Sequence, residues 1–178
     1  MPNPTVNVMI RQLAAVIRRR EDLIVRRWVD AIYSDARTEL PGVLSFEQLV
    51  GPVQEMLDFL CRQFERLLDE ENIADDVRQL RAYAQVRFYQ GVLIDEVARE
   101  LMILRKILNE VLWKEAAINT PEGYRALKWA LGQLNTFIDE MVIQTLVIYA
   151  AILRPPVETR TSVWPPSRRR KIDFPNLR

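Results

Sequence analysis

The apolar residues of this chain recur three and four positions apart through almost its whole length, and this spacing restricts the fold most strongly. Between Ile94 and Val111 they form one continuous seam, which is the pattern of a helix with one buried face. Only 5 glycines occur in 178 residues, few for a protein built on tight β-turns. The spacing therefore predicts an all-α fold, with a single globin-like or helical-bundle domain of five to six helices.

The sequence also indicates where the main helices begin and end. Helical segments are predicted at residues 5–36, 45–69, 74–90, 94–117 and 120–153. Ser45 and Gln48 match a capping box, in which each side chain bonds the backbone amide of the other residue. Pro52 lies inside the second segment, where a proline can kink a helix. The charged run at residues 18–22 interrupts the first segment and allows a bend there.

The last 25 residues differ in composition from the rest of the chain. Residues 154–178 hold five of the ten prolines, which excludes a regular helix. They carry seven basic and two acidic residues, whereas residues 1–153 carry 18 basic and 22 acidic ones. The sequence therefore predicts two parts, an acidic helical domain at 1–153 and an extended basic tail at 154–178.

The residue types present argue against an enzyme. The chain contains no histidine, which removes the commonest general base and the usual protein ligand of zinc, haem and di-iron sites. No glycine-rich phosphate loop or nucleophile elbow occurs. We therefore expect no catalytic residue, no metal site and no cofactor. The single cysteine, Cys61, is expected to pack in or beside the core, as are Trp28, Trp113 and Trp129.

Three carboxylates lie close together on the predicted helix at 94–117. Asp95, Glu96 and Glu100 are expected on a solvated face that pairs with neighbouring arginines, Arg99 and Arg105. Alternatively, Glu100 and Arg105 suit a structural ion pair with the preceding helix through the arginine at position 87. A polar ligand pocket is the weaker alternative for this group.

Three segments resemble a known bacterial module. They are REDLIVRRWVDAIY, with Trp28 and Tyr33; EQLVGPVQEMLDFLCRQFERLL; and RFYQGVLIDEVARELMILRKIL, with Arg87, Gly91, Glu96, Glu100, Leu104 and Arg105. Over roughly residues 8–150 the chain resembles the N-terminal domain of RsbRD-type stressosome co-antagonists, which also occurs at the front of some sensor kinases. The resemblance implies an all-helical fold without haem, a dimer, and a role in sensing or interaction. Those relatives continue into a regulatory domain or kinase core, whereas this sequence continues into its basic tail.

Two functions are compatible with these features. The first is a non-enzymatic adaptor that docks onto a larger protein complex through its helical domain and its tail. The alternative is a free-standing regulator that controls a separate kinase or phosphatase. Nucleic-acid binding is disfavoured because the acidic domain would repel phosphates. The longest apolar run, about 13 residues, is shorter than the roughly 20 that span a bilayer, and no signal peptide is recognised, so we expect no transmembrane segment and a cytoplasmic protein.

Two sets of residues are candidates for contacts with proteins. In the tail, aromatic and aliphatic anchors surround a basic run, and partner binding is predicted for Trp164, Arg168, Arg169, Arg170, Lys171, Ile172, Phe174 and Leu177. The last helix is apolar around most of its circumference. Self-association is therefore predicted at Phe137, Met141, Ile148 and Ile152; the alternative is a central helix enclosed by its own domain.

Overall fold

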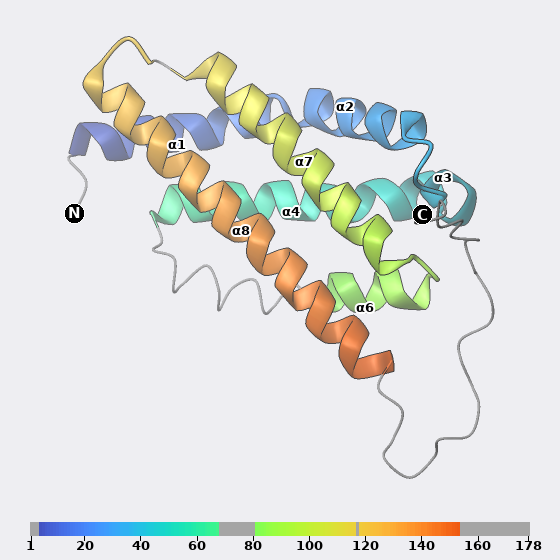
Figure 1. Cartoon of the computed structure of the whole chain (residues 1–178). Helices are drawn as coiled ribbons and strands as arrows, with labels where there is room; N and C mark the ends of the chain where they lie inside the picture. Colours follow the sequence, from blue (N-terminus) through green and yellow to red (C-terminus); the bar gives the residue numbers. More distant parts are fainter. Residues whose placement is uncertain (1–3, 68–80, 117, 154–178) are drawn as a thin grey trace, which may run out of the picture.

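The computed structural model describes residues 4–67, 81–116 and 118–153 (Figure 1). Within these ranges the chain forms seven helices and no strand, which confirms the all-α fold. The helices are α1 (Pro4–Arg19), α2 (Glu21–Ser34), α3 (Leu40–Val43), α4 (Phe46–Arg66), α6 (Arg81–Tyr89), α7 (Ile94–Glu115) and α8 (Pro121–Leu153). Their number exceeds the five to six helices predicted, because the first predicted segment divides in two and α3 is too short to show periodicity.

The division of the first segment falls at Arg20. Its φ of −101° and ψ of 8° depart from helical values. Arg18 and Arg19 lie in the last turn of α1, and Glu21 and Asp22 lie in the first turn of α2. Basic residues stabilise the C-terminal end of a helix and acidic residues the N-terminal end. The charged run therefore favours a junction between two helices at the place where the sequence allowed a bend.

The capping box predicted for α4 is confirmed, and a side chain also caps α8. The Ser45 hydroxyl accepts a hydrogen bond from the Gln48 amide at 3.2 Å, and the Gln48 side-chain oxygen accepts one from the Ser45 amide at 2.9 Å. Thr120 caps α8 by accepting a hydrogen bond from the Gly123 amide at 3.1 Å. Helix α4 continues through Pro52 to Arg66, so the proline does not end it.

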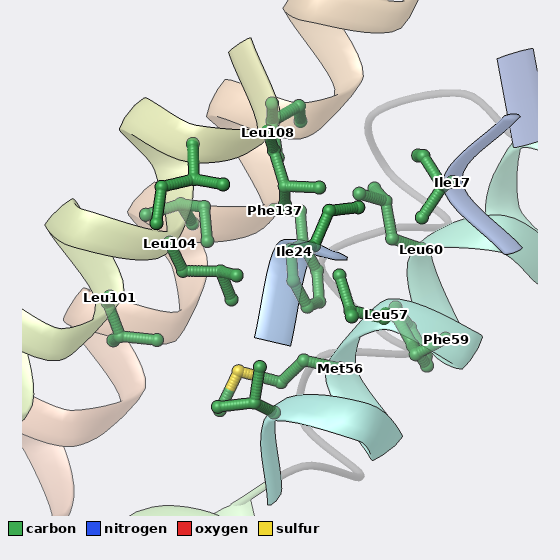
Figure 2. Close-up of a cluster of buried hydrophobic side chains, with 14 of the residues drawn as sticks. Ile17, Ile24, Met56, Leu57, Phe59, Leu60, Leu101, Leu104, Leu108 and Phe137 are labelled. Carbon is green, nitrogen blue, oxygen red and sulfur yellow. The ribbon is translucent and has the colours of Figure 1, made fainter. Parts of the chain in front are cut away.

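The helices form two layers that cross each other around one core. Helices α7 and α8 run side by side and cross α1, α2 and α4, while α6 packs against the C-terminal half of α8 (Figure 1). Side chains from α1, α2, α4, α7 and α8 converge between them, as Figure 2 shows for Ile17, Ile24, Met56, Leu57, Phe59, Leu60, Leu101, Leu104, Leu108 and Phe137. Leu40 of α3 and Tyr83 of α6 belong to the same cluster, so all seven described helices share one hydrophobic core, and the predicted seam of α7 faces it.

Helix α8 is the longest helix described and the most apolar. It has 33 residues, and by length and composition alone it could cross a membrane. Core helices of other proteins pass the same test, and the inner side of α8 packs in this core through residues such as Phe137, Ile138 and Met141. However, only 33% of its most apolar window is buried within the chain. Much of that apolar surface therefore faces outward, and the absence of a transmembrane segment stays a prediction.

Candidate functional site

The most specific segment of the family resemblance forms a buried polar cluster between α6 and α7. Arg87 and Glu100 are fully buried. Two parallel hydrogen bonds join them, from Arg87 Nε to Glu100 Oε1 at 3.0 Å and from Arg87 Nη2 to Glu100 Oε2 at 3.1 Å. The Tyr83 hydroxyl also donates to Glu100 Oε1, and the guanidinium lies over the Tyr83 ring. Such a two-pronged arginine–carboxylate pair has both strength and a fixed geometry.

Arg87 also supplies a hydrogen-bond donor that α4 lacks. In a regular helix the Gln48 carbonyl would accept a hydrogen bond from the amide of residue 52, but Pro52 has no N–H. Arg87 Nη1 donates to this carbonyl at 2.7 Å. The same guanidinium reaches the Leu49 carbonyl and the Gln90 side chain. One side chain of α6 thus satisfies the backbone of α4 and the carboxylate of α7 together.

Helix α2 joins the same cluster through its central tryptophan. Trp28 is 1% exposed, and its indole N–H donates to the Glu100 carbonyl at 2.9 Å. The expectation that Trp28 lies in the core is confirmed. Trp129 is half-buried with its ring at the edge of Phe64. The expectation for Trp113 is wrong, because this side chain is 49% exposed on α7.

Glu96 holds the beginning of α7 in place. Its side chain accepts hydrogen bonds from the Leu93 amide at 3.0 Å and from the Glu39 amide, just before α3, at 2.7 Å. Gly91 lies in the turn before α7 with a φ of 77°, a left-handed conformation that glycine adopts without steric cost. Both residues of the resemblance segment therefore have structural roles at the α6–α7 turn.

These positions correct part of the sequence interpretation. Glu96 and Glu100 do not lie on a solvated face, because both are buried. The ion pair between Glu100 and the preceding helix is confirmed through Arg87, but Arg105 takes no part in it. Arg105 instead binds Asp139 of α8 at 2.8 Å.

Electrostatics support a structural role for the cluster. Burial raises the pKa of Glu100, and the positive charge of Arg87 opposes that shift. For Arg87 itself, burial lowers the pKa, but the neighbouring carboxylate outweighs it and the net pKa is raised. The guanidinium is thus held in its charged form while its donors bind protein groups. This arrangement holds α2, α4, α6 and α7 together.

The remaining candidate groups offer little chemistry. Cys61 is buried, as expected, and burial raises the pKa of its thiol to about 12. A thiol with such a pKa is a poor nucleophile at neutral pH. Across residues 4–67, 81–116 and 118–153, no group of three potential ligands is placed to hold a metal ion.

The predicted contact residues divide into three groups. The tail candidates lie outside the described residues; they are Trp164, Arg168, Arg169, Arg170, Lys171, Ile172, Phe174 and Leu177. Phe137 and Met141, predicted for self-association, are 1% and 2% exposed and pack in the core of the chain itself. The chain's own helices therefore cover both side chains, as in the alternative of a helix enclosed by its own domain. Ile148 is half-buried and Ile152 is exposed.

A different side of α8 presents apolar residues to solvent. We call it the α8 outer stripe; it consists of Ile143, Leu146, Val147, Ala150 and Leu153, all of them exposed. The sequence contained a signal for it. One face of α8 carries the charged residues Arg125, Lys128 and Asp139 and, further along, the apolar residues Ile143 and Leu146. The residues lie on one face because they are separated by helical spacings of three, four or seven, or by sums of these. Because charged side chains face solvent, the charged part of this face indicates that its apolar continuation faces solvent as well.

Comparison with known proteins gives one match. The family model described as the RsbT co-antagonist protein rsbRD N-terminal domain matches residues 22–160. No curated protein and no solved structure matches the chain. The matched range covers more than half of the chain, and it includes the Trp28, Arg87, Glu96 and Glu100 positions described above. The chain belongs to the RsbRD N-terminal domain family, a family of stressosome-related signalling and regulatory domains.

Proposed function

We propose that this chain is a non-enzymatic adaptor of a stressosome-related signalling complex, which self-associates through the α8 outer stripe and docks onto other proteins. Family membership supports the signalling role. The polar cluster supports a non-enzymatic role, because its charged groups bind one another and the backbone. A cytoplasmic location fits such a complex and is part of the proposal.

The observation that carries the proposal is the exposure of the α8 outer stripe. Ile143, Leu146 and Val147 are each about half exposed, and Leu153 is 44% exposed. Single exposed apolar residues are common on protein surfaces. These residues instead form a continuous stripe over three turns without a charged side chain. A contiguous apolar patch of this kind marks an interaction site.

The composition of the stripe favours a second copy of the chain as its occupant. In a symmetric dimer the same surface meets itself. Two antiparallel α8 helices centred near Leu146 would place Ile143 of one copy opposite Ala150 of the other. The central facing pairs, Ile143 with Ala150 and Leu146 with Val147, would be apolar, while Leu153 would lie opposite Glu140 at the edge of the contact. No charge would then be buried without a partner at its centre. The stripe is therefore suited to pairing with itself.

Substitution of Leu146 by glutamate is expected to weaken self-association by at least ~30-fold. Burying an unpaired carboxylate in an apolar contact costs several kcal/mol, and ~2 kcal/mol corresponds to that factor. The dissociation constant is measured by sedimentation velocity over a concentration series. Lys128→Glu, on the charged half of the same face, is the matched control and should leave the constant unchanged.

A monomeric wild-type protein at high concentration would contradict this proposal, as would equal constants for Leu146→Glu and Lys128→Glu. Because Leu146 is 51% exposed, its replacement is not expected to unfold the chain. Far-UV circular dichroism checks that both variants keep their helices.

The tail is proposed as a second contact of the adaptor. Its aromatic residues Trp164 and Phe174 suit apolar pockets, and its basic run suits acidic groups. Deletion of residues 155–178 is expected to remove the protein partners that co-purify with the chain from its own organism, while self-association persists. Co-purification followed by mass spectrometry measures this. Unchanged partners after the deletion would favour the alternative function, a regulator that acts through its helical domain alone.

A further inference from the structure

A second exposed surface lies on α7, on the side that faces away from the core. We call it the α7 outer face; it consists of Met102, Arg105, Lys106, Asn109, Trp113 and Lys114, which with Glu110 line one open hollow. Met102 is 56% exposed and Trp113 is 49% exposed. The spacing of four, three and four from Met102 through Lys106 and Asn109 to Trp113 gives one row, about 16 Å long at 1.5 Å per residue.

The α7 outer face carries unpaired positive charge. Arg105 binds Asp139, and Glu110 binds Arg27 of α2. In the part of the chain that the structure describes, neither Lys106 nor Lys114 forms an ion pair. Two ammonium groups therefore accompany the exposed methionine and tryptophan. They stand out against a domain at residues 1–153 that is acidic as a whole.

This charge argues against a second copy as the occupant. A two-fold axis near Glu110 would place Lys106 of one copy opposite Lys114 of the other, so like charges would meet twice. Like charges facing each other across an interface cost several kcal/mol. The contrast with the uncharged α8 outer stripe is direct, because that stripe can meet itself without such a cost. The occupant of the α7 outer face must therefore bring negative charge.

We propose that the α7 outer face binds an acidic amphipathic helix of a different protein. Apolar residues on one side of that helix would cover Met102 and Trp113, and carboxylates beside them would reach Lys106 and Lys114. Helical ligands commonly bind in this way, through apolar anchors three and four positions apart. Methionine adapts to varied apolar shapes, and tryptophan is enriched among the residues that dominate binding energy. The proposal does not depend on self-association through the α8 outer stripe.

The proposal is tested with a photoreactive side chain, p-benzoylphenylalanine, in place of Met102 in the full chain, expressed in the organism that makes it. The expected product is a cross-link to a segment of another protein that carries carboxylates and apolar residues at spacings of three and four. The matched control places the probe at Gln54, an exposed residue of α4. Cross-linked peptides are identified by mass spectrometry.

Charge reversal provides the second arm. Lys106→Glu/Lys114→Glu is expected to lower the yield of this cross-link at least ~10-fold, because two attractive contacts become repulsive. Arg19→Glu/Arg26→Glu changes the net charge equally at exposed positions of α1 and α2 and should not lower it.

Four results would overturn the inference. They are a yield at position 102 no higher than at position 54, a cross-link to a second copy of this chain, a cross-link to nucleic acid or to a basic segment, and a yield that the Lys106→Glu/Lys114→Glu change leaves intact. Purified variants are compared by circular dichroism, so loss of fold is measured separately from loss of contact.

Discussion

Replacement of Arg87 by methionine is expected to lower the free energy of unfolding by about 3–5 kcal/mol. The change leaves the Glu100 carboxylate buried without its counter-charge, which is among the costliest changes in a protein interior. It also leaves the Gln48 carbonyl without a donor, since Pro52 cannot supply one. Urea unfolding followed by far-UV circular dichroism gives the free energy, with the slope checked for two-state behaviour.

Arg105→Met is the matched control for this prediction. It removes an arginine–carboxylate pair from the same segment, but its partner Asp139 is largely exposed. Such surface pairs contribute about 0–1 kcal/mol. A double replacement, Arg87→Met/Glu100→Leu, should recover part of the loss, because no unpaired charge stays buried. If Arg87→Met destabilised the protein no more than Arg105→Met, the cluster would not hold the helices together as we describe.

The two tryptophans Trp28 and Trp113 are expected to differ sharply in their contribution to stability. Trp28→Ala should cost about 3–5 kcal/mol, because it opens a large cavity in the core and removes the indole donor to the Glu100 carbonyl. Trp113→Ala should change stability by no more than ~0.5 kcal/mol, as is usual for surface positions. The same urea titration measures both.

Trp113→Ala is thus the control for Trp28→Ala, and the pair distinguishes a tryptophan packed in the core from one exposed on the α7 outer face. A loss of several kcal/mol on replacing Trp113 would place this side chain in the core and contradict the exposed α7 outer face. A small loss on replacing Trp28 would contradict the packing of α2 against α7.

Local sequence signals predicted the helices well. The spacing of three and four predicted α4, α7 and α8, and the capping box at Ser45 placed the start of α4 within one residue. These signals act between residues a few positions apart, so they can be read along the chain. The four-residue α3 contains too few positions to show any period, and the break at Arg20 was visible only as a run of charge.

Burial of the polar cluster could not be predicted in the same way. Glu96 and Glu100 look like surface residues because the groups that cover and bind them include some that are distant in sequence: the Glu39 amide lies 57 positions from Glu96, and Trp28 lies 72 positions from Glu100. Similarly, an apolar sequence around the whole of α8 does not indicate which side faces the core. The packing of neighbouring helices decides this, and it placed Phe137 and Met141 inside and Leu146 outside.

The hydrogen bond from Arg87 to the Gln48 carbonyl couples position 87 to position 52, which lies 35 residues earlier. The coupling arises because Pro52 lacks the N–H from which this carbonyl would otherwise accept a hydrogen bond. Any residue other than proline at 52 would bring its own N–H to this carbonyl, and the arginine would then be a redundant donor at that point. Conversely, with proline at 52, a side chain too short to reach α4 from position 87 would leave the carbonyl unsatisfied. Substitutions at 52 and 87 should therefore be non-additive, and each position determines which residues the other tolerates.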